Sequence, residues 1–237
     1  MHSQEVRVNI APAMSVEIQL SGSRFEDARR ATTEFRSLFE NPGWTKPLDW
    51  VFHHAGEHGT IELLPLMQHA ALAHTCLPSR TSPAFQKRET GADPTPLRHG
   101  LPAISASKLF AMEDILEINL PPVYRAFLQN WNGGVPRVGG FQTQSGSDET
   151  VDCFLGFPTG TDSAHPADLM AFLIEYGERL PEGLFPIAYD PFGNLILLSL
   201  EDAGLWFWDH ERVENVECVA PAFEDFLGSF FDLSLDK

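Results

Sequence analysis

The sequence predicts an α+β fold in which helices pack against an antiparallel strand meander. Two observations lead to this prediction. Apolar residues recur with helical i, i+3, i+4 spacing in three segments of the second half, residues 124–131, 169–176 and 223–230. Between the last two segments lie short apolar stretches, and the turn-rich connections that join them are too short for the crossover that parallel neighbours need.

The first 77 residues predict a β-β-α accessory region of unknown family. Residues 6–10 and 16–20 each alternate apolar with polar side chains, which indicates two half-buried strands. Residues 25–39 have an apolar helical face, and Asn41-Pro42-Gly43 ends that helix. A further helix is expected over residues 61–74, with Pro65 either in its first turn or breaking it.

A proline-rich segment, residues 78–102, separates this region from a second domain over residues 103–237. Its five prolines, with Ser, Thr and Gly between them, predict a linker or a long ordered loop. In the second domain one helix is expected over residues 109–116. Pro122 suits the start of the next helix, because its missing N–H has no partner there, and Asn132-Gly133-Gly134 ends it. Strands are expected over residues 152–157, 185–189, 195–200, 205–208 and 213–219.

Negative charge is concentrated in the second part of the chain. Residues 1–98 carry 10 Lys+Arg and 11 Asp+Glu, a balance of −1, whereas residues 99–237 carry 6 and 22, a balance of −16. A domain this acidic repels nucleic acid and membrane surfaces and attracts basic partners. Acidity that merely keeps the protein soluble is the alternative interpretation.

Neither export nor a disulfide framework is indicated. No apolar stretch approaches the roughly 20 residues that a membrane span needs, and residues 1–5 lack the basic-then-apolar layout of a signal peptide. Cys76, Cys153 and Cys218 are far apart and form no C-x-x-C pair. We therefore expect a soluble, cytoplasmic protein whose cysteines are free thiols.

Two segments contain residues that could carry chemistry, and each has a simpler interpretation. Asn132-Gly133-Gly134 lacks the Lys-Ser/Thr of a phosphate loop and ends a helix instead of opening one. Asp209-His210-Glu211 offers three possible metal ligands in a row. Alternation along a strand would place Asp209 and Glu211 alone on one side, so an acidic turn between strands is favoured.

The densest group of possible metal ligands lies in the first part of the chain, at His53, His54, His58, His69, His74 and Cys76. His54 and His58 lack the H-E-x-x-H pattern, and Gly56 and Gly59 argue against a helix there. Surface or capping histidines are therefore the favoured interpretation. Cys153 has no nucleophile motif around it. We expect no cofactor, no metal site and no catalytic residue.

Three blocks of the second domain resemble the SUKH superfamily, which includes bacterial immunity proteins and fungal cell-wall assembly regulators. The first block is residues 120–128 running into Asn132-Gly133-Gly134. The second is Phe185-Pro186-Ile187-Ala188-Tyr189-Asp190 with Gly193-Asn194, and the third is Phe207-Trp208-Asp209-His210-Glu211 before the closing helix. The resemblance covers residues 105–232. It implies a curved antiparallel sheet with packed helices and, for bacterial members, a cytosolic antidote to toxins of polymorphic, contact-dependent or type VI secretion systems.

We therefore predict an immunity protein, not an enzyme, that binds a cognate toxin such as a basic nuclease, and neither nucleic acid nor membrane. A regulatory or scaffold interaction protein is the alternative, and a metal protein or enzyme built on the N-terminal histidines ranks third. Trp206 and Trp208 alternate with Phe207, so one side of that strand is core and the other is available for an interface. Acidic residues of predicted loops and strand edges are the candidate partner-binding residues, because an acidic face steers a basic partner. They are Asp148, Glu149, Asp152, Asp162, Asp202, Asp209, Glu211 and Glu214.

Overall fold

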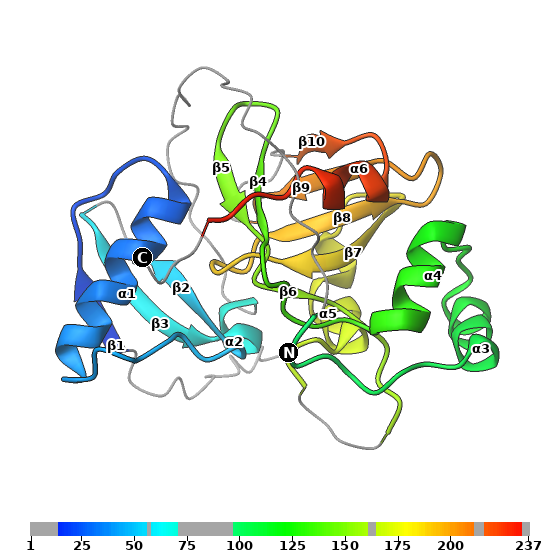
Figure 1. The fold of residues 1–237 in the computed structure, drawn as a ribbon, viewed down its shortest axis with the longest axis horizontal. Coiled ribbons are helices and arrows are strands. Elements are labelled where there is room, and N and C mark those ends of the chain that lie inside the picture. Colours follow the sequence, from blue (N-terminus) through cyan, green and yellow to red (C-terminus); the bar gives the residue numbers. More distant parts are fainter. Residues whose placement is uncertain (1–13, 56–57, 71–96, 161–164, 211–215, 234–237) are drawn as a thin grey trace, which may run out of the picture.

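The computed structural model describes residues 14–55, 58–70, 97–160, 165–210 and 216–233, and it confirms the predicted α+β class. A three-stranded sheet with two helices forms the first part of the chain, and a five-stranded sheet with four helices forms the second. The two parts lie side by side, and a two-stranded hairpin stands between them (Figure 1).

The first part contains β1 (Met14–Glu17), α1 (Arg24–Leu38), β2 (Trp50–His54), β3 (Thr60–Pro65) and α2 (Leu66–Ala70), with sheet order β1-β3-β2. Ser23 caps α1 by accepting a hydrogen bond from the Glu26 N–H. The apolar face of α1 covers the sheet through Ala28, Ala31 and Phe35, and the Phe35 ring stacks on that of Phe52.

The helix predicted over residues 61–74 is wrong at its start. Residues 60–65 form β3, in which Ile61 and Leu63 are buried while Glu62 between them is half-buried. In this segment the pairing of β3 with β1 and β2, with Ile61 and Leu63 on its buried side, decides the structure, although the apolar spacing also fits a helix. The short helix α2 begins only after Pro65. The second predicted strand is β1, which ends at Glu17, whereas residues 6–10 lie outside the described residues. Strand β2 was not predicted.

The second part follows the prediction closely. Helices α3 (Ala106–Leu116), α4 (Pro122–Trp131), α5 (Leu169–Tyr176) and α6 (Phe223–Gly228) lie where the apolar spacing placed them. Strands β6 (Cys153–Phe154), β7 (Leu184–Tyr189), β8 (Leu195–Ser199), β9 (Leu205–Trp208) and β10 (Val216–Ala220) form an antiparallel meander of order β10-β9-β8-β7-β6. A 3-10 turn, η1 (Gly177–Arg179), follows α5, and the hairpin of β4 (Gly140–Gln142) and β5 (Asp148–Thr150) was not predicted.

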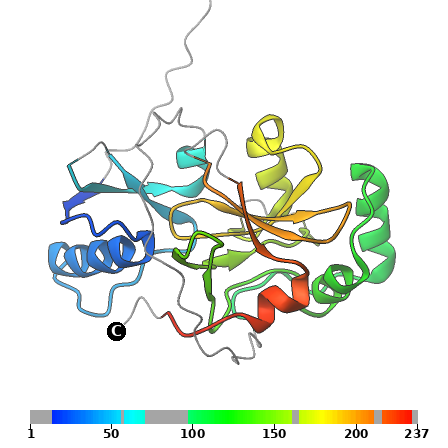
Figure 2. The ribbon, with the colours of Figure 1, turned by 90° about the horizontal axis from the view of Figure 1, so that it is seen from above.

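Helices cover both faces of the meander (Figure 2). On one face, the ring of Tyr176 from α5 contacts that of Trp208. On the other face, Phe141 lies between the rings of Phe207 and Phe226 of α6. Phe207 and Trp208 are therefore both core residues, whereas Trp206 is only half-buried.

Asn132 ends α4 as the sequence predicted, and its own backbone is the first to turn left-handed, with φ of 44°. Its buried side chain donates hydrogen bonds to the carbonyls of Pro102 (2.7 Å) and Phe157 (2.9 Å) and accepts one from the Phe157 N–H (2.9 Å). A Cβ on Gly133, whose φ is 80°, would lie 2.8 Å from the Phe154 carbonyl oxygen. The motif therefore ends a helix and joins it to β6.

The two parts of the chain share their cores. Val51, Leu66 and Ala70 of the first part belong to the main hydrophobic cluster, while Phe192 of the second part belongs to the cluster under α1. Between them, the Phe52 N–H donates to the Pro191 carbonyl (2.9 Å), and the Tyr189 hydroxyl donates to the Leu48 carbonyl (2.9 Å).

Candidate partner-binding site

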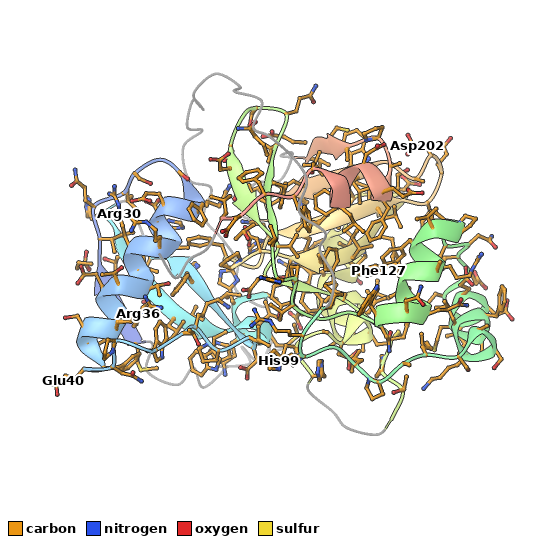
Figure 3. The ribbon with its side chains drawn as sticks, viewed as in Figure 1. Arg30, Arg36, Glu40, His99, Phe127 and Asp202 are labelled. Carbon is orange, nitrogen blue, oxygen red and sulfur yellow. The ribbon has the colours of Figure 1, made fainter. Side chains whose placement is uncertain are left out.

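Of the eight acidic residues predicted to face a partner, five lie in described parts of the chain: Asp148, Glu149, Asp152, Asp202 and Asp209. Asp162, Glu211 and Glu214 lie outside the described residues. The five divide into two groups. Four lie near the first part of the chain. Asp202 lies at the opposite end of the molecule from Arg30 and Arg36 of α1 (Figure 3).

Glu149 and Asp209 face the interior, so the expectation that they form an exposed face is wrong. Glu149 is 2% exposed and Asp209 is 0% exposed. Both lie against Arg24 at the start of α1, which forms a salt bridge with the Asp209 carboxylate and lies 3.7 Å from that of Glu149. The physical reason for the burial is that a basic residue of the first part matches both charges, and such matching is what makes a buried charge tolerable.

Burial changes the protonation of this acidic group. It raises the pKa of Glu149 to about 6, and the carboxylates of Asp209 and Glu217 act in the same direction, while Arg24 opposes them. Burial also raises the pKa of Asp190 to about 8, although its carboxylate accepts hydrogen bonds from the N–H groups of Phe192 and Asn194. The second part of the chain thus contains a buried acidic centre that depends on Arg24.

Asp152 and Asp148 also contact neighbours within the chain. The Asp152 carboxylate forms an ion pair of 2.8 Å with Lys46, whose side chain is only 5% exposed. Asp148 accepts a hydrogen bond of 3.2 Å from the side-chain amide of Gln142 across the β4–β5 hairpin. Together Arg24 and Lys46 give the first part of the chain two cations, and these lie against acidic residues of the second part.

Asp202 is the candidate residue that remains exposed, in the turn between β8 and β9. Its pKa is lowered by hydrogen bonding with Ser199 and by the Gly204 N–H, which donates to its carboxylate over 3.0 Å. The carboxylate therefore stays ionised near neutral pH. It lies at the rim of a cavity of about 650 Å³.

This cavity combines an acidic rim with an apolar floor. Glu182, Glu201 and Asp202 are exposed at the rim, and Leu184, Leu200 and Trp206 are half-buried below them. Among the described lining residues none is basic. The sequence analysis singled out Asp202 and considered Trp206 for an interface, but it missed Glu182. Glu182 joins the site through the turn before β7, which pairs with β8, and no local pattern predicts that contact.

Trp206 carries a buried donor without an acceptor. Its Nε1 is buried, and the described residues place no hydrogen-bond acceptor within reach of it. A Cβ added to Gly204 would lie 3.5 Å from Nε1 and 3.2 Å from the Asp202 carboxylate, so all three groups meet at this turn. An unmatched buried N–H costs ~1–3 kcal/mol, so the arrangement is unusual for a residue that serves packing alone.

Comparison with known proteins assigns the second part of the chain to a family. Residues 103–229, more than half of the chain, match the SMI1/KNR4 family (SUKH-1). The chain belongs to this family. The SUKH-1 match contains the meander, its helices, the buried acidic centre and the cavity beside Trp206.

The chain is also similar to the SPbeta prophage-derived uncharacterized protein YokK of Bacillus subtilis (strain 168). The two are 33% identical over 60 residues, which make up 24% of this chain. That match spans 31% of the relative's length, less than a third.

Two histidines, His165 and His210, lie within the SUKH-1 match, and His210 is buried near His69. His69 Nε2 lies 3.1 Å from His53 Nδ1, and the His54 imidazole lies 3.6 Å from the Asp27 carboxylate. His74 and Cys76 are outside the described residues. Within the described parts of the chain, no three His, Cys, Asp or Glu side chains are grouped as metal ligands. None of the described helices is long and apolar enough to span a membrane.

Proposed function

We propose that this SUKH-1 protein is an immunity protein that binds a cognate bacterial toxin and blocks it by direct contact, without chemistry of its own. Family membership over residues 103–229 is the observation that carries the proposal.

The distribution of charge supports a basic partner. Residues 99–237 have a balance of −16, while two cations of the first part, Arg24 and Lys46, are already paired internally. A strongly acidic surface accelerates encounter with a basic toxin and repels nucleic acid. The inhibitor would then act by covering the active site of the toxin or a surface beside it.

The test is purification of the tagged protein from its native host under conditions in which toxins are expressed, with mass spectrometry of what co-purifies. We expect one stoichiometric partner with a toxin domain. Co-expression of this protein should then rescue growth of a strain that produces the isolated toxin domain.

A regulatory scaffold role would give a different result, namely several substoichiometric housekeeping proteins and no rescue. That outcome would replace the immunity proposal. Metal analysis of the purified protein tests the third possibility, since retention of zinc or nickel would point to the histidines of the first part.

A further inference from the structure

We propose that the cavity beside Trp206 is an arginine-binding pocket that receives an arginine side chain from an exposed peptide segment of the toxin. This inference rests on the proposed function and adds to it the position and the chemistry of one contact. The pocket comprises the rim acids Glu182, Glu201 and Asp202 and the floor residues Leu184, Leu200 and Trp206.

The first argument is charge. Three acidic residues of this domain are paired with cations of the first part: Glu149 and Asp209 with Arg24, and Asp152 with Lys46. The three rim acids differ, because no basic side chain of the described residues forms an ion pair with them. Three exposed carboxylates around one cavity attract a cation and repel an anion. A positive group supplied by a partner would neutralise their charge.

The second argument is the shape and chemistry of the floor. A cation that enters between the rim acids must bring an aliphatic stem, and Leu184 and Leu200 offer apolar surface to such a stem. The indole of Trp206 is the aromatic side chain that a cation binds best. An arginine fits these features better than a lysine, because its planar guanidinium stacks on an aromatic ring and its fork of N–H groups binds carboxylates in pairs.

The third argument is the unmatched donor. The N–H of Trp206 has no acceptor among the described residues and lies against the turn that carries Asp202 and Gly204. A peptide that delivers an arginine also delivers main-chain carbonyl oxygens. A main-chain carbonyl placed against the indole N–H would satisfy this donor, so the occupant we infer is a peptide segment and not a free small cation.

The experiment is a titration of the full-length, nitrogen-15-labelled protein, followed through the indole N–H signals of its five tryptophans. The Trp206 signal is assigned by its loss in Trp206→Phe. The probe is a capped hexapeptide of Gly and Ser with one central arginine, and the matched probe has citrulline, which keeps the shape and removes the charge. We expect the arginine peptide to move the Trp206 signal in a saturable manner, at least tenfold more tightly than the citrulline peptide, with the other indole signals unmoved.

Two matched variants locate the effect. Glu182→Gln with Asp202→Asn should weaken binding of the arginine peptide about tenfold, whereas Glu34→Gln on α1 with Glu40→Gln just after that helix should leave it unchanged. Equal binding of the arginine and citrulline peptides, or no saturable movement of the Trp206 signal, overturns the pocket assignment. Because the probe is a synthetic peptide, either result stands apart from toxin rescue, and failure of the pocket leaves the immunity proposal intact.

Discussion

At the scale of single residues, Arg24 has the largest predicted effect on stability. It is the cation that lies against both Glu149 and Asp209, which are buried. Removing one partner of a buried pair costs ~3–5 kcal/mol, because the opposite charge remains in a low-dielectric environment. We expect Arg24→Met to lower the free energy of unfolding by ~3 kcal/mol at pH 7 in urea denaturation.

The matched control is Arg29→Met, which removes an equally basic residue of the same helix. Arg29 pairs with Glu26 at the surface, where solvent screening leaves an ion pair with little effect on stability. Similar losses for the two variants would show that Arg24 is an ordinary surface arginine, and the buried acidic centre would have to be stabilised in another way.

Because its pKa is raised in the folded state, Glu149 makes the free energy of unfolding depend on pH. Its pKa rises from 4.5 unfolded to about 6 folded, so between these values the folded state holds a proton that the unfolded state releases. Stability therefore falls as pH rises through this window, by ~2 kcal/mol from this residue alone. Asp190, raised to about 8, extends the fall toward neutral pH. Glu26, lowered to about 2, acts oppositely and removes stability below its unfolded pKa of 4.5.

We expect Glu149→Gln to flatten the decline in unfolding free energy between pH 4.5 and 6, measured by urea denaturation at several pH values. Glu34→Gln, an exposed change on α1, is the control and should keep the wild-type slope. If Glu149→Gln keeps the slope as well, the group titrates normally and burial does not perturb it.

At the scale of elements, hydrogen bonds of the Asn132 side chain hold the end of α4 against the neighbouring segments. The Asn132 side chain satisfies the carbonyls of Pro102 and Phe157 and the N–H of Phe157. Asn132→Ala leaves these buried groups unmatched, and we expect a loss of ~3 kcal/mol in unfolding free energy. Asn132→Gly should recover ~1 kcal/mol of this loss, because glycine tolerates the left-handed backbone.

Asn130→Ala is the control for the end of α4. Asn130 lies two positions earlier, is exposed, and among the described residues its side chain bonds to the helix carbonyl of Ala126 alone. It should change stability by less than ~0.5 kcal/mol. A comparable loss in both variants would mean that helix propensity, and not the Asn132 contacts, sets the effect.

Elements were predictable from sequence where apolar spacing was regular. Helices α4, α5 and α6 each keep one apolar face, and short turns fixed the antiparallel order of β7, β8 and β9. Strand β3 was mistaken for helix because its apolar residues also fit a helical face, and β4 and β5 are too short and polar to give a pattern. The candidate site was less predictable than the elements. Arg24 and Asp209 are 185 residues apart, so no local sequence pattern indicates that α1 covers acidic residues that we expected at the surface.

At the scale of the whole molecule, some acidic residues are paired with cations within the chain, whereas others are exposed and available to a partner. The acidic residues near α1 are matched within the chain by Arg24 and Lys46, which removes Glu149, Asp152 and Asp209 from the surfaces available to steer a partner. Asp202 at the rim of the arginine pocket lies far from Arg30 and Arg36 of α1 (Figure 3), and the rim acids Glu182, Glu201 and Asp202 are all exposed. Steering should therefore be concentrated at that end.

Once the toxin is identified, the association rate measured by stopped flow gives the last prediction. We expect this rate to fall ~10-fold or more between 50 and 500 mM salt, because screening shortens the reach of the acidic field from about 14 Å to about 4 Å. Glu201→Lys with Asp202→Lys should slow association several-fold at low salt. Glu34→Lys on α1 with Glu40→Lys just after that helix should leave the rate within about twofold, although both pairs change the net charge equally. Equal slowing by the two pairs would mean that net charge alone steers the partner, and the division of charge between the two ends of the molecule would then have no part in binding.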